Sequence, residues 1–270
     1  MPRAGSLPTA RHAPRDQADG LRRLFAGRGQ HLLPLVANPH LSRGALVLDR
    51  IAGALAALGR DVLVVDAAAA SPPPHELALL DLSRGVEALA PGVAYLPARG
   101  LPRAFVDARG SAAGFVDALQ SAAPRAEVLL LHADATDLAR LLGRRAVRPL
   151  LLADDTAQSL QYAYAACKRL VQRCGWMSFD LLLAAATSPA RGAAVAARLA
   201  GCADRFLDAA LHDWALLDAD DDAVAGAQDV LARLLGAQLG IDENPAPAWA
   251  APSEILPWRG AAQPPRPHFR

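Results

Sequence analysis

Residues 38–45 (NPHLSRGA) have the position, but not the residue types, of a loop that wraps a phosphate. Such a loop needs glycines that let backbone N–H groups reach the phosphates, a lysine for the β- and γ-phosphates, and a Ser or Thr for magnesium. Here Gly44 stands alone at the entrance of an expected helix, Pro39 removes a donor, and no lysine is present. Arg43 supplies a positive charge of a different shape. The pattern indicates the architecture of a phosphate-binding loop without its chemistry.

The elements that must position this loop alternate between apolar strands and amphipathic helices. Strands are expected at residues 31–37, 61–67, 92–98, 126–133, 147–153, 177–186 and about 214–217. Helices are expected at about residues 16–26, 45–58, 112–122, 136–142, 156–172, 189–199 and 222–239. Runs such as VLVV are typical of parallel strands buried on both faces. We therefore predict an α/β fold with a doubly wound, mostly parallel sheet flanked by helices.

The composition narrows the function classes. The chain has 270 residues, 53% of them apolar, with a formal net charge of +1. This balance argues against a nucleic-acid binder, which carries a basic excess, and against full disorder. Lys168 is the only lysine, so any mechanism that needs a lysine must use it.

Three regions are expected along the chain. Residues 1–27 form a flexible N-terminus with one interaction helix, residues 28–240 form the α/β domain, and residues 241–270 are a Pro-rich, disordered tail. The N-terminus lacks the apolar run of a signal peptide, and the three cysteines match no disulfide framework or zinc pattern. We expect a cytoplasmic protein.

The stretch DQADGLRRL (residues 16–24) resembles the DQAxxLR helix of the FlhG/FleN group of MinD/ParA-type P-loop ATPases. That bacterial group regulates flagellar number and placement, and its helix contacts the signal-recognition-type GTPase FlhF and stimulates GTP hydrolysis. The matching positions are Asp16, Gln17, Ala18, Leu21 and Arg22. The resemblance implies an FlhF-type partner, with Gln17 reaching the partner's site. The alternative is that Asp16 is an N-cap and the apolar side chains dock the helix on its own core.

Other segments extend the resemblance over about three-quarters of the chain. IAGALAALGRDVLVVDA (residues 51–67) is similar to the family's LAxxLAxxGxxVLLLDAD, and TAQSLQYAYAACKRL (residues 156–170) to its TSxTDAYALIK. The segment at residues 204–222 looks like the family's rFLxxxLxxLGxVPxD.

The sequence differs from the family at the positions that bind phosphate and metal. The family's GKGGVGKT corresponds to residues 38–45, which places its signature lysine at Pro39, its phosphate lysine at Gly44 and its magnesium Thr at Ala45. The second carboxylate of its DAD is lost after Asp66, and its metal-side Asp is His132. The vestigial nucleotide loop thus comprises Asn38, Pro39, Ser42, Arg43, Gly44, Ala45 and Asp66, of which Asn38 and Ser42 are ordinary turn and capping residues.

These departures predict a pseudo-ATPase without catalytic residues, metal or cofactor, because nothing neutralises a transferring phosphoryl group. It would act as a non-catalytic flagellar regulator through protein contacts. The alternative is an ATP- and magnesium-binding, dimerising MinD/FlhG-type switch, in which Arg43 and the helix N-terminus at Gly44 hold phosphates.

The remaining polar groups are given structural interpretations. His132 and Asp134 follow a buried strand, as a catalytic pair could. Because the sequence offers no nucleophile beside them, we expect His132 to be a structural histidine with its hydrogen bonds satisfied. Residues 154–155 and 220–222 are read as solvated acidic clusters, and Arg144, Arg145 and Arg148 as a solvated loop.

The last helix, residues 222–240, resembles in position the C-terminal amphipathic helix by which MinD-like proteins contact membranes. It carries the apolar side chains Val230, Leu231, Leu234, Leu235 and Leu239 but few cations. Core packing is therefore favoured, with peripheral membrane contact as the alternative.

Overall fold

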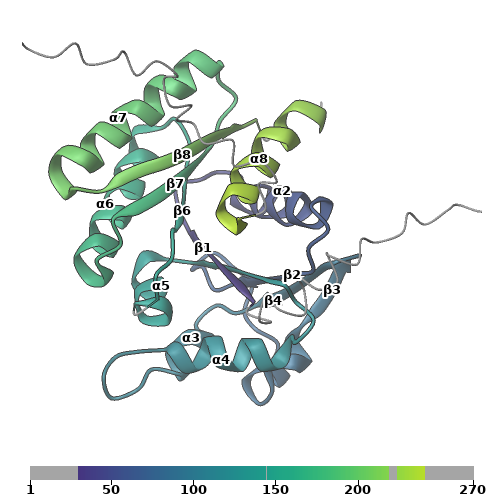
Figure 1. The fold of residues 1–270 in the computed structure, drawn as a ribbon. Helices are drawn as coiled ribbons and strands as arrows, with labels where there is room; N and C mark the ends of the chain where they lie inside the picture. The colour runs from purple at the N-terminus through teal and green to yellow at the C-terminus, as the bar shows by residue number, and fades with distance from the viewer. Residues whose placement is uncertain (1–29, 144, 219–223, 241–270) are drawn as a thin grey trace, which may run out of the picture.

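Eight strands form one sheet in the order β3-β4-β2-β5-β1-β6-β7-β8 in a computed structural model, which describes residues 30–143, 145–218 and 224–240 (Figure 1). The strands are β1 (His31–Val36), β2 (Val62–Asp66), β3 (Glu87–Ala90), β4 (Val93–Pro97), β5 (Val128–Ala133), β6 (Leu150–Ala153), β7 (Ser178–Ala184) and β8 (Ala210–Leu217). All neighbouring strands pair in parallel except β3 and β4. The predicted doubly wound, mostly parallel sheet is confirmed.

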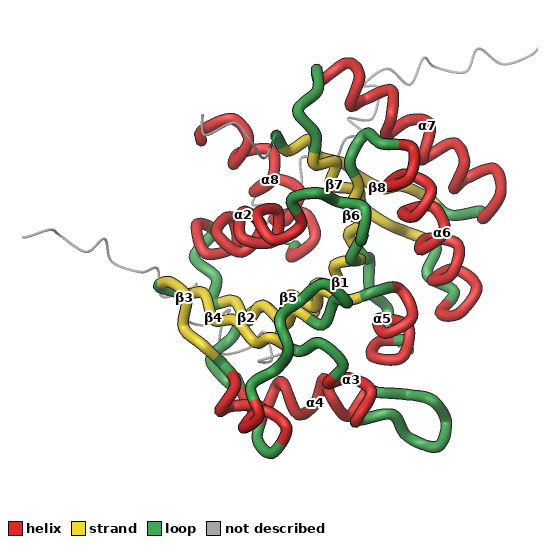
Figure 2. Tube along the Cα trace, turned by 180° about the vertical axis from the view of Figure 1, so that it is seen from behind, coloured by secondary structure: helices red, strands yellow, loops and turns green. Residues whose placement is uncertain are grey.

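Two layers of helices cover the sheet (Figure 2). The helices α2 (Gly44–Ala57) and α8 (Val224–Leu239) pack together on one face. The other face carries α3 (Leu101–Ala104), α4 (Ala113–Ala122), α5 (Ala135–Leu142), α6 (Ala157–Cys174) and α7 (Pro189–Leu207). Because β1 lies between β5 and β6, the direction of the crossovers reverses beside it, and the loop from β1 to α2 lies where such folds hold ligands.

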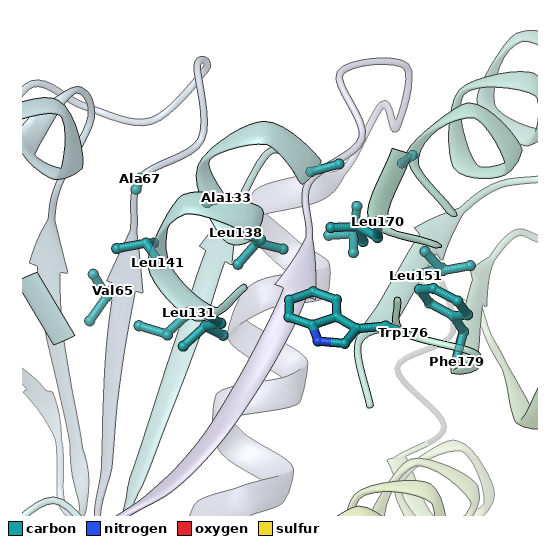
Figure 3. Packing of buried hydrophobic residues seen from close by; sticks show 14 of the residues in the cluster. Val65, Ala67, Leu131, Ala133, Leu138, Leu141, Leu151, Leu170, Trp176 and Phe179 are labelled. Atoms are coloured by element: carbon teal, nitrogen blue, oxygen red, sulfur yellow. The ribbon is translucent and has the colours of Figure 1, made fainter. Parts of the chain in front are cut away.

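The core follows from the strand sequences. In β5, Val128 and Leu130 face the layer of α2 and α8, whereas Leu129 and Leu131 face the opposite layer. Figure 3 shows Leu131 of the second pair, which lies near Leu138 and Leu141 of α5. Each of these side chains is at most 2% exposed, so the central strands are apolar on both faces.

Helix α2 shows how local sequence defines an element. Val47, Leu48, Ile51 and Leu55 recur at helical spacing and are buried. The helix ends at Ala57 with Leu58 as its C-cap, and Gly59 follows with φ +74°, the left-handed conformation that favours glycine.

Most predicted elements are observed within a few residues of their expected ends, with three differences of length. Strand β6 begins only at Leu150, because Pro149 has no N–H to donate to a neighbouring strand. Helix α7 runs two turns beyond the predicted end, since Leu199 and Ala203 continue its buried stripe. Strand β8 begins at Ala210, earlier than predicted.

Four short elements were missed by the sequence patterns. They are β3, α3 and two 3-10 turns, Glu76–Leu79 and Leu82–Gly85. All four residues of β3 are exposed, so it has no apolar alternation, and it exists through its antiparallel pairing with β4. The helix expected at residues 16–26 and the tail after residue 240 lie outside the described residues, and the three-region division remains a prediction.

Helix α8 packs into the core, as the sequence pattern favoured over membrane contact. Leu231, Leu234, Leu235 and Leu239 are buried, while Val230 is 39% exposed. Of the helices in the described ranges, none combines the length and apolar character that crossing a membrane requires.

Candidate functional site

The vestigial loop follows β1 at the carboxyl edge of the sheet. Residues 38–43 turn the chain, and α2 begins at Gly44 with Arg43 at its N-cap position and no side-chain capping bond. Gly44 and Ala45 therefore occupy the first turn of a 14-residue helix, where backbone N–H groups lack intrahelical partners. The loop thus lies between β1 and α2, and its assignment as a vestigial nucleotide loop remains a prediction.

Asn38 holds the loop to the neighbouring elements. Its Nδ2 donates to the Leu152 carbonyl (2.9 Å), the Ser159 carbonyl (3.0 Å) and the Ser159 hydroxyl (2.9 Å), so it ties β1 to β6 and α6. Its Oδ1 accepts from the His40 N–H at 3.1 Å, which forms an Asx turn. The local turn role was anticipated, but the long-range bonds to Ser159 were not, because they join residues 121 positions apart.

The first backbone donors of the loop are not directed at a ligand. Pro39 has no N–H, the His40 N–H is bonded to Asn38 Oδ1, and the Leu41 N–H donates to the Asn38 carbonyl at 3.1 Å. A phosphate cradle depends on consecutive free N–H groups. Only the N–H groups near the start of α2 remain to serve an anion here.

Asp66 ends β2 and forms the centre of a buried polar cluster. Its Oδ1 lies 2.7 Å from His132 Nδ1 and accepts hydrogen bonds from the Ser71 hydroxyl and the Ala68 N–H, and its Oδ2 accepts from the Tyr95 hydroxyl at 3.2 Å. Asp66 and His132 face each other in register on the adjacent strands β2 and β5.

The cluster keeps Asp66 ionised. Burial alone raises the pKa of Asp66, but the hydrogen bond and charge of His132, together with the bonds from Ser71 and Ala68, bring it below the ordinary value. Burial and the neighbouring Asp66 charge raise the pKa of Tyr95, so its hydroxyl remains a donor.

His132 does not pair with Asp134. Asp134 instead caps α5, where its Oδ1 accepts from the N–H groups of Thr136 (2.7 Å) and Asp137 (2.9 Å). The structure gives His132 a structural partner through Nδ1, and that partner, Asp66, is the vestigial carboxylate. Nothing local in the sequence signals this pair, which is formed across two strands.

Two charged side chains that we expected to be solvated, those of Asp154 and Arg148, are instead paired in the structure. Asp154 is 8% exposed and accepts from the backbone and hydroxyl of Thr156. Arg148 Nε lies 2.8 Å from Oδ2 of Asp180, which is fully buried in β7, and Gln238 Nε2 of α8 donates to the same oxygen at 2.6 Å. These groups are structural pairs, because a buried charge requires a partner. Arg145 keeps an exposed pair with Asp117, and residues 144 and 220–222 lie outside the described part of the chain.

A pocket of about 550 Å³ opens between the vestigial loop, the start of α2 and strands β2, β3 and β4. Its walls include Leu48 and Ala52 of α2, Val64 of β2, and Val93 of β4. Its polar lining includes Asn38, Ser42, Asp49, Asp66, Tyr95, His132, Asp134 and Tyr162. Among the residues described, no three His, Cys, Asp or Glu side chains gather as a metal site would require.

Comparisons with known proteins identify the fold. Neither the family models nor the curated proteins contain a match to this chain. A plasmid partition protein from Borrelia burgdorferi is similar in structure, with a TM-score of 0.55 at 9% identity over 77% of this chain and 100% of that one. MinD in the MinC:MinD cell division complex of Aquifex aeolicus gives 0.51 at 11% identity, covering 76% and 96%. The ATP complex of a Cyanothece McdA variant gives 0.50 at 17% identity, covering 80% and 99%. The chain therefore has the fold of MinD/ParA-type P-loop NTPases.

Proposed function

We propose that this chain is a non-catalytic regulator built on the MinD/ParA fold, a pseudo-ATPase that acts in flagellar biosynthesis through contact with an FlhF-type GTPase. The observation that carries the non-catalytic part is the state of the vestigial loop. Pro39 has no N–H, and those of His40 and Leu41 are already bonded to Asn38.

The residues at the reaction positions support the same proposal. Gly44 and Ala45 stand where the family resemblance implies the phosphate lysine and the magnesium Thr. His132, where it implies the metal-side Asp, is bonded to Asp66, so the remaining carboxylate is already engaged. Without the lysine and the magnesium ligands, the charge of a transferring phosphoryl group has no counterpart.

The flagellar role and the partner rest on the resemblance of residues 16–24 to the DQAxxLR helix, with Asp16, Gln17, Ala18, Leu21 and Arg22 as the contact residues. These residues lie outside the described part of the chain. In this proposal, Gln17 reaches the GTPase site, while the α/β domain serves as a scaffold.

Calorimetry tests the non-catalytic part. ATP with magnesium is titrated into the full chain at micromolar protein concentration, and we expect no binding heat and no hydrolysis above background. Micromolar affinity or turnover would instead support the ATP-binding, dimerising switch, in which the N–H groups at the start of α2 hold the phosphates.

A GTPase assay tests the partner. The full chain and a synthetic peptide of residues 11–27 are each added to an FlhF-type GTPase, and we expect both to raise its rate of GTP hydrolysis. Gln17→Ala in either form serves as the matched control and should remove the stimulation. An unchanged hydrolysis rate with both wild-type forms would exclude this mechanism.

A further inference from the structure

The pocket beside the vestigial loop has the dimensions and walls of a small-molecule site. Its volume of about 550 Å³ lies within the usual range for ligand pockets, roughly 300–1,000 Å³. The apolar part is formed by Leu48 and Ala52 on one side and by Val64 and Val93 on the sheet. These walls suit an apolar body and offer little to a phosphate chain.

The charged groups in the pocket wall are all acidic. Asp49, Asp66 and Asp134 line it, and no Lys or Arg is found among its lining residues within the described ranges. Arg43 lies between two lining residues in sequence, but it is exposed and is not part of the wall. Gly44 and Ala45 of the first turn of α2 also line the pocket, but a helix N-terminus carries only about half a positive charge. The three carboxylates outweigh it, so the pocket repels a polyanion and attracts a cation.

His132 adds a largely buried polar side chain to this wall. The residue is 9% exposed, and its Nδ1 lies 2.7 Å from Oδ1 of Asp66, so this ring nitrogen already has a partner. Within the described ranges no hydrogen bond involves Nε2, and His132 lines the pocket. The rings of Tyr95 and Tyr162 also line the pocket and provide faces on which a cation can rest.

We propose that this pocket binds a small organic cation, a primary ammonium attached to an aliphatic or aromatic body. The apolar body contacts Leu48, Ala52 and Val64, and the ammonium donates to the Asp134 carboxylate. The site replaces nucleotide binding at the same edge of the sheet. It stands independently of the GTPase partner, because it uses only the described α/β domain.

A series of probes with one apolar body and three head groups tests the proposal. 2-Phenylethylamine, 2-phenylethanol and 3-phenylpropionate are titrated into the full chain by calorimetry at pH 7. We expect the ammonium to bind at least about ten-fold more tightly than the carboxylate, with the alcohol between them. Equal affinities, tighter carboxylate binding, or no binding of the ammonium at millimolar concentration would each overturn the proposal.

Two variants locate the site, each with a matched control. Asp134→Asn keeps an N-cap for α5 but removes the charge, so it should weaken ammonium binding several-fold. Asp117→Asn, which changes an exposed side chain on α4, should not. Ala45→Trp fills the pocket mouth from an exposed position and should abolish binding, whereas Ala197→Trp, exposed on α7, should leave it unchanged. Ammonium binding that survives Ala45→Trp would place the ligand elsewhere and refute the assignment.

Discussion

At the end of β2, Asp66 accepts from four donors that come from three segments of the chain: Ala68 and Ser71 after β2, Tyr95 of β4, and His132 of β5. A carboxylate that positions a metal ion must keep an oxygen open to the metal. Here His132 on the neighbouring strand occupies Oδ1 of Asp66, so this oxygen is not open to a metal ion. The Asp66 carboxylate instead joins three segments of the chain.

Replacing Asp66 with Asn should destabilise the protein by about 1–3 kcal/mol at pH 7, because the charge-assisted bonds to His132 and Ser71 are lost. The pKa of Asp66 is lowered in the folded state, so its stabilising effect is present above the ordinary Asp value and disappears as pH falls through the folded value. The difference between the wild type and Asp66→Asn should therefore shrink between about pH 5 and pH 2.

Urea unfolding at a series of pH values measures this difference. Asp117→Asn, which changes an exposed acid on α4, is the control for the loss of one negative charge and should stay within about 0.5 kcal/mol of the wild type. A difference for Asp66→Asn that stays constant down to pH 2 would contradict an ionised Asp66.

The strand, loop and helix at residues 31–58 show what local pattern can predict. The strand run, the turn residues and the helical spacing of Val47, Ile51 and Leu55 are all local, and the sequence placed both elements and the loop correctly. The bonds from Asn38 to Ser159 and from Asp66 to His132 join distant segments, and without the strand order no spacing reveals them. Asp180 was missed for the same reason, since Arg148 and Gln238 reach it from other elements.

Restoring two side chains should not restore nucleotide binding. Gly44→Lys with Ala45→Thr returns the lysine and hydroxyl that the family resemblance implies, and a Cβ at Gly44 meets nothing within 4 Å, so the fold should tolerate the change. The N–H groups of His40 and Leu41 remain bonded to Asn38, and the three carboxylates remain in the pocket wall. We expect no ATP binding heat at micromolar protein, with unchanged circular dichroism as the folding control. Micromolar ATP affinity in this variant would show that the wild type fails to bind ATP only because it lacks these two side chains.

Across the whole molecule, α8 closes one face of the sheet. Its leucines pack with α2 and β8, and Gln238 reaches the buried Asp180 of β7. A helix held in this way cannot offer the same leucines to a lipid surface without opening the core. The few cations on α8 agree with this, because helices that lie on anionic membranes carry a basic face.

One substitution placed at two positions of α8 separates core packing from membrane contact. Leu234→Asp puts a charge at a fully buried position and should destabilise the chain by about 4 kcal/mol or more, whereas Val230→Asp, at a 39% exposed position, should cost about 1 kcal/mol or less. Urea unfolding measures both, and co-sedimentation with anionic liposomes should show no binding by the wild type. If α8 were instead a membrane helix released from the core, the wild type would sediment with liposomes, and Leu234→Asp would abolish sedimentation while leaving the unfolding free energy unchanged.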